Sequence, residues 1–222
     1  MAAGGNLSPG MLLSAYRQGI FPWYSEGDPV LWWAPDPRFV ILPGEIHVSR
    51  SMQRVLRRGA FQVTLDHDFA GVIERCSTTP RPGQPGTWIT DDMMAAYCRL
   101  HRLGYAHSCE AWQEGVLAGG VYGVALGRVF FGESMFAHVS NASKAALIRL
   151  CRFLDRHCYE LFDAQLYTPH VERMGGRAMP RPDFMRRVRR ALDRPTMRGN
   201  WSELPFPGER PDPFSSGNRC PQ

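Results

Sequence analysis

Residues 119–150 constrain the fold of this chain more than any other part of the sequence. Two apolar runs, residues 121–125 and 129–131, flank a turn that contains Gly127, and this pattern is typical of a β-hairpin. Glu133 then follows among apolar neighbours at the end of the second run. A buried carboxylate must be hydrogen-bonded, paired or protonated. A hairpin followed by a core helix would explain the apolar residues here, but it leaves Glu133 unexplained.

A helix is expected directly after this acidic loop. Ser140 and Asn141 are good capping residues, and they precede an alanine-rich stretch whose apolar residues include Leu147 and Leu150. The first turn of a helix offers free backbone N–H groups and partial positive charge, so it can receive a phosphate or a reacting carbonyl oxygen. The order of strand, acidic loop and capped helix therefore predicts a binding site.

Composition narrows the class of protein. With 222 residues, 44% of them hydrophobic, the chain can form one large domain, or one domain with a small appendage. Its net charge of +5 comes almost entirely from arginine, since Lys144 is the only lysine. The six cysteines form no C-x-x-C pair and no zinc-type spacing, so reduced, mostly structural thiols are expected. The sequence has no transmembrane run and no signal segment, which favours a cytoplasmic protein.

The N-terminal part combines a short helix with an aromatic loop. Residues 7–19 predict a helix with Ser8 as its N-cap and Pro9 in its first turn. Residues 20–38 then contain three of the six tryptophans among prolines. Such rings can form the wall of a pocket or stack on a base, or they can simply attach a small N-terminal unit to the main domain. The boundary is expected at the proline-rich residues 35–37.

A basic stripe is predicted on the helix formed by residues 47–59. Its members lie at positions i, i+4, i+7 and i+8, on one face and without a neighbouring carboxylate: Arg50, Arg54, Arg57 and Arg58. A charged helix face is most often only solvated. A stripe of one sign would also suit a phosphate backbone.

Asp163 and Gln165 are the second pair of polar residues in an apolar context. They alternate with apolar residues over 160–167, so a strand there would place both side chains on one face. A shared site is favoured over a purely structural hydrogen-bonded pair. The chain has no nucleophile elbow, no P-loop and no paired metal ligands. This absence favours direct transfer between two positioned substrates.

The remaining elements follow from periodicity and from the turn residues between them. Strands are expected over residues 38–42, 61–65, 106–112 and 115–119, and helices over residues 68–76, 92–103, 170–175 and 183–190. The first two of these helices have Asp68 and then Thr90 or Asp91 as expected caps. The end from Pro205 is rich in Pro, Ser and Gly, which is typical of a flexible tail.

Six segments of the chain closely resemble the leucyl/phenylalanyl-tRNA–protein transferase family. In order they are residues 17–24, 31–38, 86–90, 132–136, 141–144 and 163–165, and the likeness extends over residues 7–201. The resemblance implies an α+β fold with a small N-terminal α/β domain, residues 1–36. It further implies a GNAT-like acyltransferase domain with a mixed, mostly antiparallel sheet, residues 37–204, and a tail, residues 205–222.

The resemblance also implies an activity. The protein would transfer Leu or Phe, and weakly Met, from aminoacyl-tRNA to the N-terminal Arg or Lys of an acceptor protein, which creates an N-degron. Aminoacyl-tRNA would be the co-substrate, with no cofactor and no metal. The implied partners are Leu-tRNA, Phe-tRNA and the acceptor proteins. A monomer without membrane contact is expected.

Residue roles carry over from the matching motifs. Asp163 would orient and polarise Gln165, Gln165 would handle the attacking amine, and Glu133 would help to hold the acceptor or the adenosine. The implied aminoacyl-adenosine site consists of Trp23, Trp88, Met135, Leu147, Leu150 and Phe162, and the implied tRNA-binding face is the stripe Arg50, Arg54, Arg57 and Arg58. The chain departs from the family in beginning later and in having Thr168 where Asn is common.

Two other functions compete with this one. An acyl-CoA-dependent GNAT enzyme would need a glycine-rich pyrophosphate loop before the central helix, and residues 137–143 contain no glycine. A non-catalytic RNA-binding module could use the arginine stripe and the tryptophans. It would leave Asp163 and Gln165 without a purpose.

Overall fold

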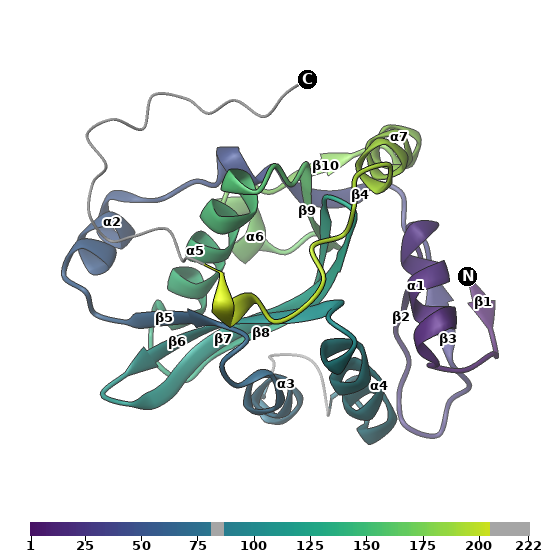
Figure 1. Ribbon diagram of the computed structural model, residues 1–222, viewed down its shortest axis with the longest axis horizontal. Helices are drawn as coiled ribbons and strands as arrows, with labels where there is room; N and C mark the ends of the chain where they lie inside the picture. The colour runs from purple at the N-terminus through teal and green to yellow at the C-terminus, as the bar shows by residue number, and fades with distance from the viewer. Residues whose placement is uncertain (81–86, 205–222) are drawn as a thin grey trace.

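A computed structural model describes residues 1–80 and 87–204. The expected tail, residues 205–222, and residues 81–86 lie outside the described residues. The chain begins with a small unit in which helix α1 (Pro9–Arg17) packs beside a three-stranded sheet (Figure 1). The order of that sheet is β1 (Ala2–Ala3), β3 (Leu31–Trp33), β2 (Phe21–Pro22). Ser8 caps α1 by accepting a hydrogen bond from the backbone N–H of Met11, as predicted.

The main sheet has seven strands in the order β10-β4-β9-β8-β7-β6-β5. Every neighbouring pair is antiparallel except β8 and β9, which are parallel. The expected α+β class with a mixed, mostly antiparallel sheet is therefore confirmed. The strands are β4 (Arg38–Ile41), β5 (Gln62–Leu65), β6 (Ala106–Gln113), β7 (Val116–Leu126), β8 (Val129–Ala137), β9 (Leu161–Gln165) and β10 (Arg177–Met179).

Two strands run further than their sequence pattern predicts. The glycines at 119 and 120 do not interrupt β7, which is a single strand of 11 residues. A Cβ atom on Gly119 would lie 2.7 Å from the Cβ of Ala142, so this glycine lets the central helix pack directly against the strand. Strand β8 continues to Ala137. Glu133 therefore lies inside a strand and not at its end, and that expectation is wrong.

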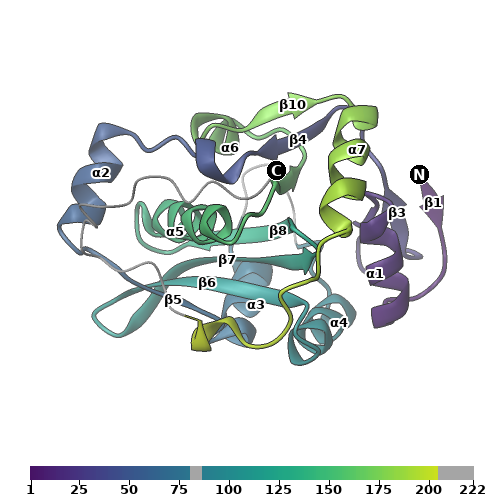
Figure 2. The ribbon, with the colours of Figure 1, turned by 45° about the horizontal axis from the view of Figure 1, so that its top comes forward.

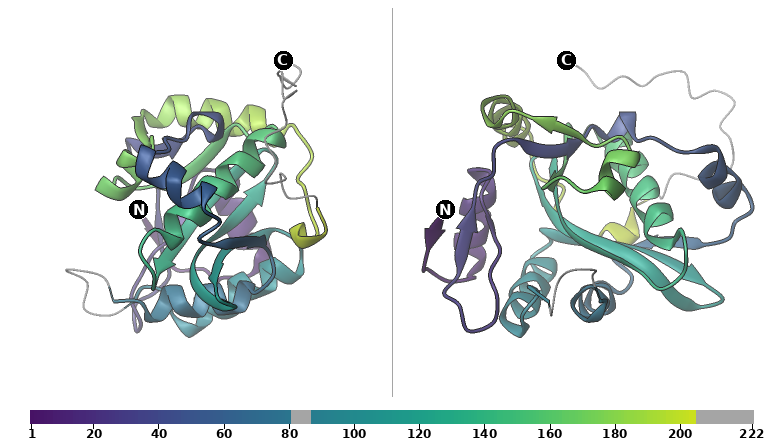
Figure 3. Two further views of the ribbon diagram at one scale, coloured as in Figure 1. Left: turned by 90° about the vertical axis from the view of Figure 1, so that its left-hand side faces the viewer. Right: turned by 180° about the vertical axis from the view of Figure 1, so that it is seen from behind.

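Helices cover both faces of the main sheet (Figures 2 and 3). Helix α5 (Ala142–Arg156) packs on one face, with α2 (Arg50–Arg57) beside it, while α3 (Phe69–Thr78) and α4 (Asp91–Arg102) pack on the other. Helix α7 (Arg181–Leu192) contacts α1 at the edge of the molecule (Figure 2). The remaining short elements are η1 (Pro43–Glu45), α6 (Pro169–Arg173) and η2 (Trp201–Glu203).

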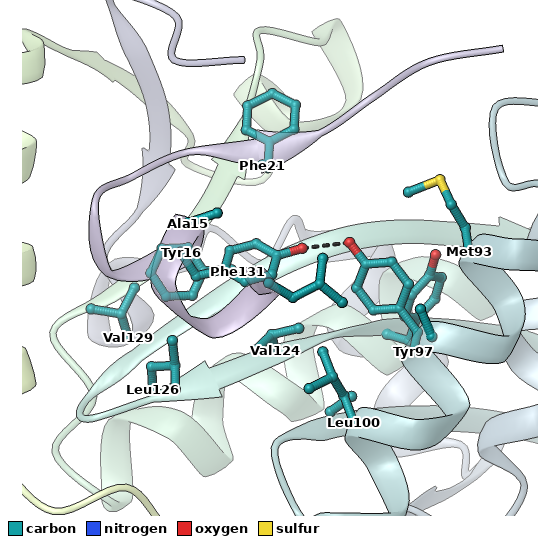
Figure 4. Close-up of a cluster of buried hydrophobic side chains, with 14 of the residues drawn as sticks. Ala15, Tyr16, Phe21, Met93, Tyr97, Leu100, Val124, Leu126, Val129 and Phe131 are labelled. Carbon is teal, nitrogen blue, oxygen red and sulfur yellow. Dashed lines mark hydrogen bonds between the residues drawn. The ribbon is translucent and has the colours of Figure 1, made fainter. Parts of the chain in front are cut away.

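The N-terminal unit shares a core with the main domain. Tyr16 of α1 is fully buried against strand β8, with its ring centroid 5.1 Å from that of Phe131. Figure 4 shows its hydroxyl pointing at the hydroxyl of Tyr97, which comes from α4 on the other side of the cluster. This cluster forms one wall of the site described below.

Two further sequence expectations can be compared with the structure. Cys76, Cys98, Cys109 and Cys151 are reduced, as expected, whereas Cys158 is disulfide-bonded, so the expectation of reduced thiols is wrong for that residue. Within the described ranges no helix has the length and apolar character that a membrane span requires.

Candidate active site

Two irregularities in the main sheet lie close together and build the site. Strand β8 bulges against β7, because Tyr122 pairs with Ser134 and Gly123 pairs with Gly132, so that Glu133 is the extra residue. Strand β9 has a similar register shift against β4, which leaves Ala164 as its extra residue just before Gln165. Bulges re-aim side chains and occur often beside active sites. Here they turn the side chains of Glu133 and Gln165 toward each other.

Glu133 receives hydrogen bonds from three residues of three different elements. Its Oε1 accepts from the Tyr16 hydroxyl at 2.7 Å and from the Gln165 Nε2 at 2.8 Å, and its Oε2 accepts from the Tyr97 hydroxyl at 2.8 Å. Only 8% of the Glu133 surface is exposed. The NH₂ end of the Gln165 amide faces this carboxyl group, since its Nε2 is the donor in that contact. The Gln165 carbonyl oxygen is then the end of the amide that remains for a substrate.

The two tyrosines and Glu133 form a closed triangle of hydrogen bonds. The hydroxyl oxygens of Tyr16 and Tyr97 are 2.5 Å apart, and each also contacts one carboxyl oxygen. When Glu133 is ionised, both hydroxyls donate to the carboxylate, and their two protons leave none for the contact between the two hydroxyl oxygens. A proton on the carboxyl completes the triangle.

The pKa of Glu133 agrees with this count of protons. Burial raises it to about 7, against the opposing effect of the hydrogen bonds from Tyr16 and Tyr97, and the nearby Asp163 charge raises it further. Burial, followed by the Glu133 charge, raises the pKa of both tyrosine hydroxyls well above 10. Both hydroxyls therefore stay protonated, and Glu133 is the group in this triangle that can gain or lose a proton near neutral pH.

Asp163 contacts the backbone of Gln165 and not its side chain. Its Oδ1 accepts a hydrogen bond from the Gln165 N–H at 2.9 Å. Both of its oxygens also accept from the guanidinium of Arg38, with Nη2 to Oδ2 at 2.7 Å and Nε to Oδ1 at 2.8 Å. Asp163 is fully buried and Arg38 is 1% exposed. The negative charge of Asp163 is thus balanced by the buried guanidinium of Arg38.

A largely apolar cavity of about 540 Å³ is lined by Glu133 and by Ala164, the residue before Gln165, whereas Asp163 and Gln165 are not among its lining residues. It forms because the parallel pairing of β8 with β9 stops at Phe131 and Asp163, after which the two strands diverge. A volume of several hundred Å³ suits a small ligand. Its apolar lining includes Val121, Met135, Phe136, Phe162 and Val171, and its polar lining includes Glu133, Ser143, Thr168 and His170.

The structure brings together some of the predicted site residues and separates others. Met135 and Phe162 line the cavity with Glu133. Leu147 and Leu150 do not line it; both are fully buried in the core between α5 and the sheet. The resemblance implied all four residues together. Helical periodicity alone cannot show whether Leu147 and Leu150 face the core or a cavity in the same layer.

The two predicted tryptophans lie at the margin of the core cluster that contains Tyr16 and Tyr97. Trp23 is half-buried and packs against Trp33, with the ring centroids 5.7 Å apart, and its backbone carbonyl accepts a hydrogen bond from the Trp33 indole. Trp88 is also half-buried. Both rings therefore keep an accessible surface on the same side of the main sheet as the tyrosines.

The predicted arginine stripe is exposed on α2. All four of its members, Arg50, Arg54, Arg57 and Arg58, are exposed, and no ion pair links them to a carboxylate within the described part of the chain. Among the described residues no three His, Cys, Asp or Glu side chains form a group that could hold a metal ion.

Sequence reasoning assigned no role to three residues that the structure places at the site. Tyr16 and Tyr97 occupy core-facing positions of their helices, and only the need of a buried hydroxyl for a partner could have identified them. Arg38 begins the apolar strand β4. A charged residue in such a strand predicts a buried partner of opposite sign, and Asp163 was the available one.

Comparison with known proteins identifies the family. Residues 40–189 match the leucyl/phenylalanyl-tRNA protein transferase domain, and residues 5–36 match the N-terminal domain of the same family. The chain is 58% identical over 205 residues to the leucyl/phenylalanyl-tRNA–protein transferase of Syntrophus aciditrophicus (strain SB), which covers 92% of this chain and 86% of that protein. It is 55% identical over 201 residues to the transferase of the same name from Anaeromyxobacter sp. (strain Fw109-5), covering 90% and 86%, and 52% identical over 203 residues to that of Myxococcus xanthus (strain DK1622), covering 91% and 87%. The chain therefore belongs to the leucyl/phenylalanyl-tRNA protein transferase family of enzymes.

Proposed function

We propose that this enzyme transfers Leu or Phe, and Met weakly, from aminoacyl-tRNA to the N-terminal Arg or Lys of an acceptor protein. The product carries a new N-terminal residue joined by a peptide bond and serves as an N-degron. The site would act in the cytoplasm, where charged tRNA is found, and on a GNAT-like domain that binds an aminoacyl ester in place of an acyl thioester.

The observation that carries this proposal is the contact of the Gln165 amide with Glu133, which lines the apolar cavity. Glu133 fixes the NH₂ end of the amide at 2.8 Å, so the carbonyl oxygen is available to accept a hydrogen bond from an incoming amine. The cavity offers apolar side chains such as Met135 and Phe162 to an uncharged amino-acid side chain. Such a pocket rejects charged side chains strongly and similar apolar ones weakly.

The chemistry requires no covalent enzyme intermediate. The amine nitrogen of the acceptor attacks the ester carbonyl carbon, the bond from that carbon to the ribose oxygen breaks, and the proton lost by the amine passes to the departing oxygen. Gln165 orients the amine for this attack. Positioning two reactants in this way can supply several kcal/mol of the barrier, about 7–11 kcal/mol in the best intramolecular cases.

Two surface features serve the remainder of the tRNA. The exposed stripe on α2, Arg50 to Arg58, presents one-signed charge to a phosphate backbone. Trp23 and Trp88 offer ring faces on which the terminal adenosine can stack, and each such contact is worth about 1–3 kcal/mol. Together, the arginine stripe and the two rings favour the adenosine end of a tRNA over a coenzyme as the ligand.

The test is a transfer assay with the purified protein, labelled Phe-tRNA or Leu-tRNA, and a peptide that begins with Arg. The expected result is label on the peptide, and none on the same peptide after N-acetylation. Gln165→Ala should lower kcat by about 10²–10⁴-fold, whereas Gln62→Ala, on an exposed strand position, should not. Binding of tRNA without transfer would support the RNA-binding alternative instead, and transfer from an acyl-CoA would support the other.

A further inference from the structure

Gln165 has a backbone conformation that residues other than glycine rarely adopt. Its φ is 65°, in the left-handed region. The N–H of Leu166 donates to the carbonyl of Ala164 at 2.7 Å, so Gln165 is the central residue of a tight γ-turn of the positive-φ kind, which is rare and strained. Strained backbone persists only where surrounding contacts hold it in place.

The contact that holds this turn is the carboxylate of Asp163. Its Oδ1 accepts the Gln165 backbone N–H at 2.9 Å. In a regular strand, the Gln165 N–H would donate to the backbone of a neighbouring strand. Here the side chain of Asp163, two residues earlier, takes the place of that acceptor. The Asp163 carboxylate must therefore be held still for the Gln165 amide to reach Glu133.

Arg38 holds that carboxylate and is itself held in place by further contacts. Its guanidinium bonds both oxygens of Asp163, and its Nη1 donates to the carbonyl of Gly19 at 3.0 Å. The guanidinium also lies between two aromatic rings, 4.8 Å from the centroid of Phe21 and 4.9 Å from that of Phe184. The bidentate contact and the two rings together fix the orientation of the guanidinium plane.

From these contacts we infer that Arg38 is a positioning residue for the transfer reaction, acting through Asp163 on the backbone turn at Gln165. This inference rests on the proposed function of Gln165. Arg38 touches no substrate. It fixes the direction in which the Gln165 carbonyl oxygen points, while Asp163 is committed to Arg38 and to the turn and does not exchange a proton with the amine.

A purely structural ion pair would predict a different pattern of effects. In that case, weakening the pair would lower the amount of folded protein and reduce activity by the same factor in any background. A positioning residue instead loses its effect once the group that it positions is gone. A double-mutant cycle between Arg38 and Gln165 separates the two cases.

The first experiment measures single-turnover transfer per folded protein for Arg38→Lys, Gln165→Ala and the double variant. Lysine keeps the charge but cannot form the bidentate contact. Arg38→Lys alone is expected to lower the rate about 100-fold, the order of loss for a misplacement of about 1 Å, with KM for aminoacyl-tRNA unchanged. In the Gln165→Ala background it should change the rate by no more than about twofold. Equal losses in both backgrounds would overturn the inference.

Arg190→Lys is the matched control. Arg190 makes a bidentate contact to Glu160, with its Nε 3.0 Å from both carboxylate oxygens, on the exposed face of α7. Its lysine variant should retain the wild-type rate. A loss there equal to that of Arg38→Lys would show that the assay reports any weakened arginine pair, and this too would overturn the inference.

A second variant covers the case in which Arg38→Lys does not fold. Buried ion pairs can often be replaced by apolar residues without loss of stability, so Arg38→Met combined with Asp163→Leu should fold and yet leave the Gln165 N–H without its acceptor. The expected result is a folded protein with transfer lowered about 100-fold. A folded double variant with the wild-type rate would contradict the inference.

Amide hydrogen exchange makes the inference independent of the proposed function. The Gln165 N–H should exchange faster in Arg38→Lys than in wild type or in Arg190→Lys, because its acceptor is no longer fixed. If the wild-type enzyme transfers no amino acid, the proposed function fails while this measurement still tests the backbone contact. Unchanged exchange at Gln165 in a wild-type-active protein would refute the positioning role alone.

Discussion

Replacing Glu133 by glutamine should make the protein more stable above neutral pH. The amide introduced by Glu133→Gln can complete the triangle with Tyr16 and Tyr97 without a charge, since it offers both a donor and an acceptor. The native carboxyl does so only when protonated. Burial raises its pKa to about 7 from 4.5 in the unfolded chain, so at pH 8 the folded protein holds a charge that its surroundings disfavour.

The size of the effect follows from the two pKa values. A group with a higher pKa in the folded state binds its proton more tightly when folded, so its contribution to stability is complete below pH 4.5 and is lost as the pH rises to about 7. At about 1.4 kcal/mol per pKa unit, this interval corresponds to about 3 kcal/mol. The unfolding free energy of Glu133→Gln minus that of wild type should increase by this amount between pH 4.5 and 7.5 and then stay level.

Urea denaturation of both proteins at half-unit steps from pH 4.5 to 8.5 gives this difference directly. The subtraction cancels the titration of all other groups. Glu45→Gln is the control, because Glu45 forms an exposed pair with Arg177 at 3.0 Å and should give a change below about 1 kcal/mol. A Glu133→Gln difference that stays flat across the range, or that falls with pH, would refute both the raised pKa and the count of protons behind it.

Three further outcomes follow from the site. In Tyr97→Phe the glutamate loses a hydrogen bond that favours its ionised form, so the limb of the kcat profile near pH 7 should move about one pH unit or more toward alkaline pH; an unmoved limb contradicts the contact. Met135→Ala should change the ratio of Leu to Phe transfer about 10-fold or more. Leu147→Ala should leave this ratio unchanged and lower the unfolding free energy by about 2–5 kcal/mol. A changed ratio in Leu147→Ala would show that Leu147 lines the cavity after all. Reversing the charges of Arg54 and Arg57 should weaken tRNA binding and flatten its salt dependence, and equal affinity at low salt would leave α2 as a plain solvated helix.

Sequence reasoning found the elements of the fold because each has a local cause. Asp68 and Thr90 cap α3 and α4, as predicted, because their side-chain oxygens accept hydrogen bonds from backbone N–H groups of the first turn. Ser49 caps α2 in the same way. Asn141 is the exception. It occupies the N-cap of α5 but makes no side-chain cap bond, and its backbone is left-handed at φ 73°. Its Oδ1 accepts from Lys144 instead.

The geometry of the site could not be predicted in the same way, because it depends on where strands depart from regular pairing. Alternation along β9 places Asp163 and Gln165 on one face, and it predicts that their side chains are neighbours. The extra residue at Ala164 and the turn at Gln165 change this arrangement. The actual contact joins a carboxylate to a backbone N–H, and no sequence pattern distinguishes such a contact from a side-chain pair. Register shifts depend on tertiary packing, as does the choice between core and cavity for Leu147.

The N-terminal unit contributes contacts to the candidate active site, although the sequence boundary near residue 36 suggests an appendage. Tyr16 supplies one of the three donors to Glu133, and Gly19 supplies the carbonyl that fixes Arg38. The two contacts reach the two candidate catalytic groups by separate routes, one through the carboxyl and one through the turn at Gln165. A shift of α1 relative to the main sheet would therefore disturb the proton balance of Glu133 and the orientation of Gln165 together. Because of this double dependence, we expect the N-terminal unit to influence the reaction more than its few strands and its single helix would suggest.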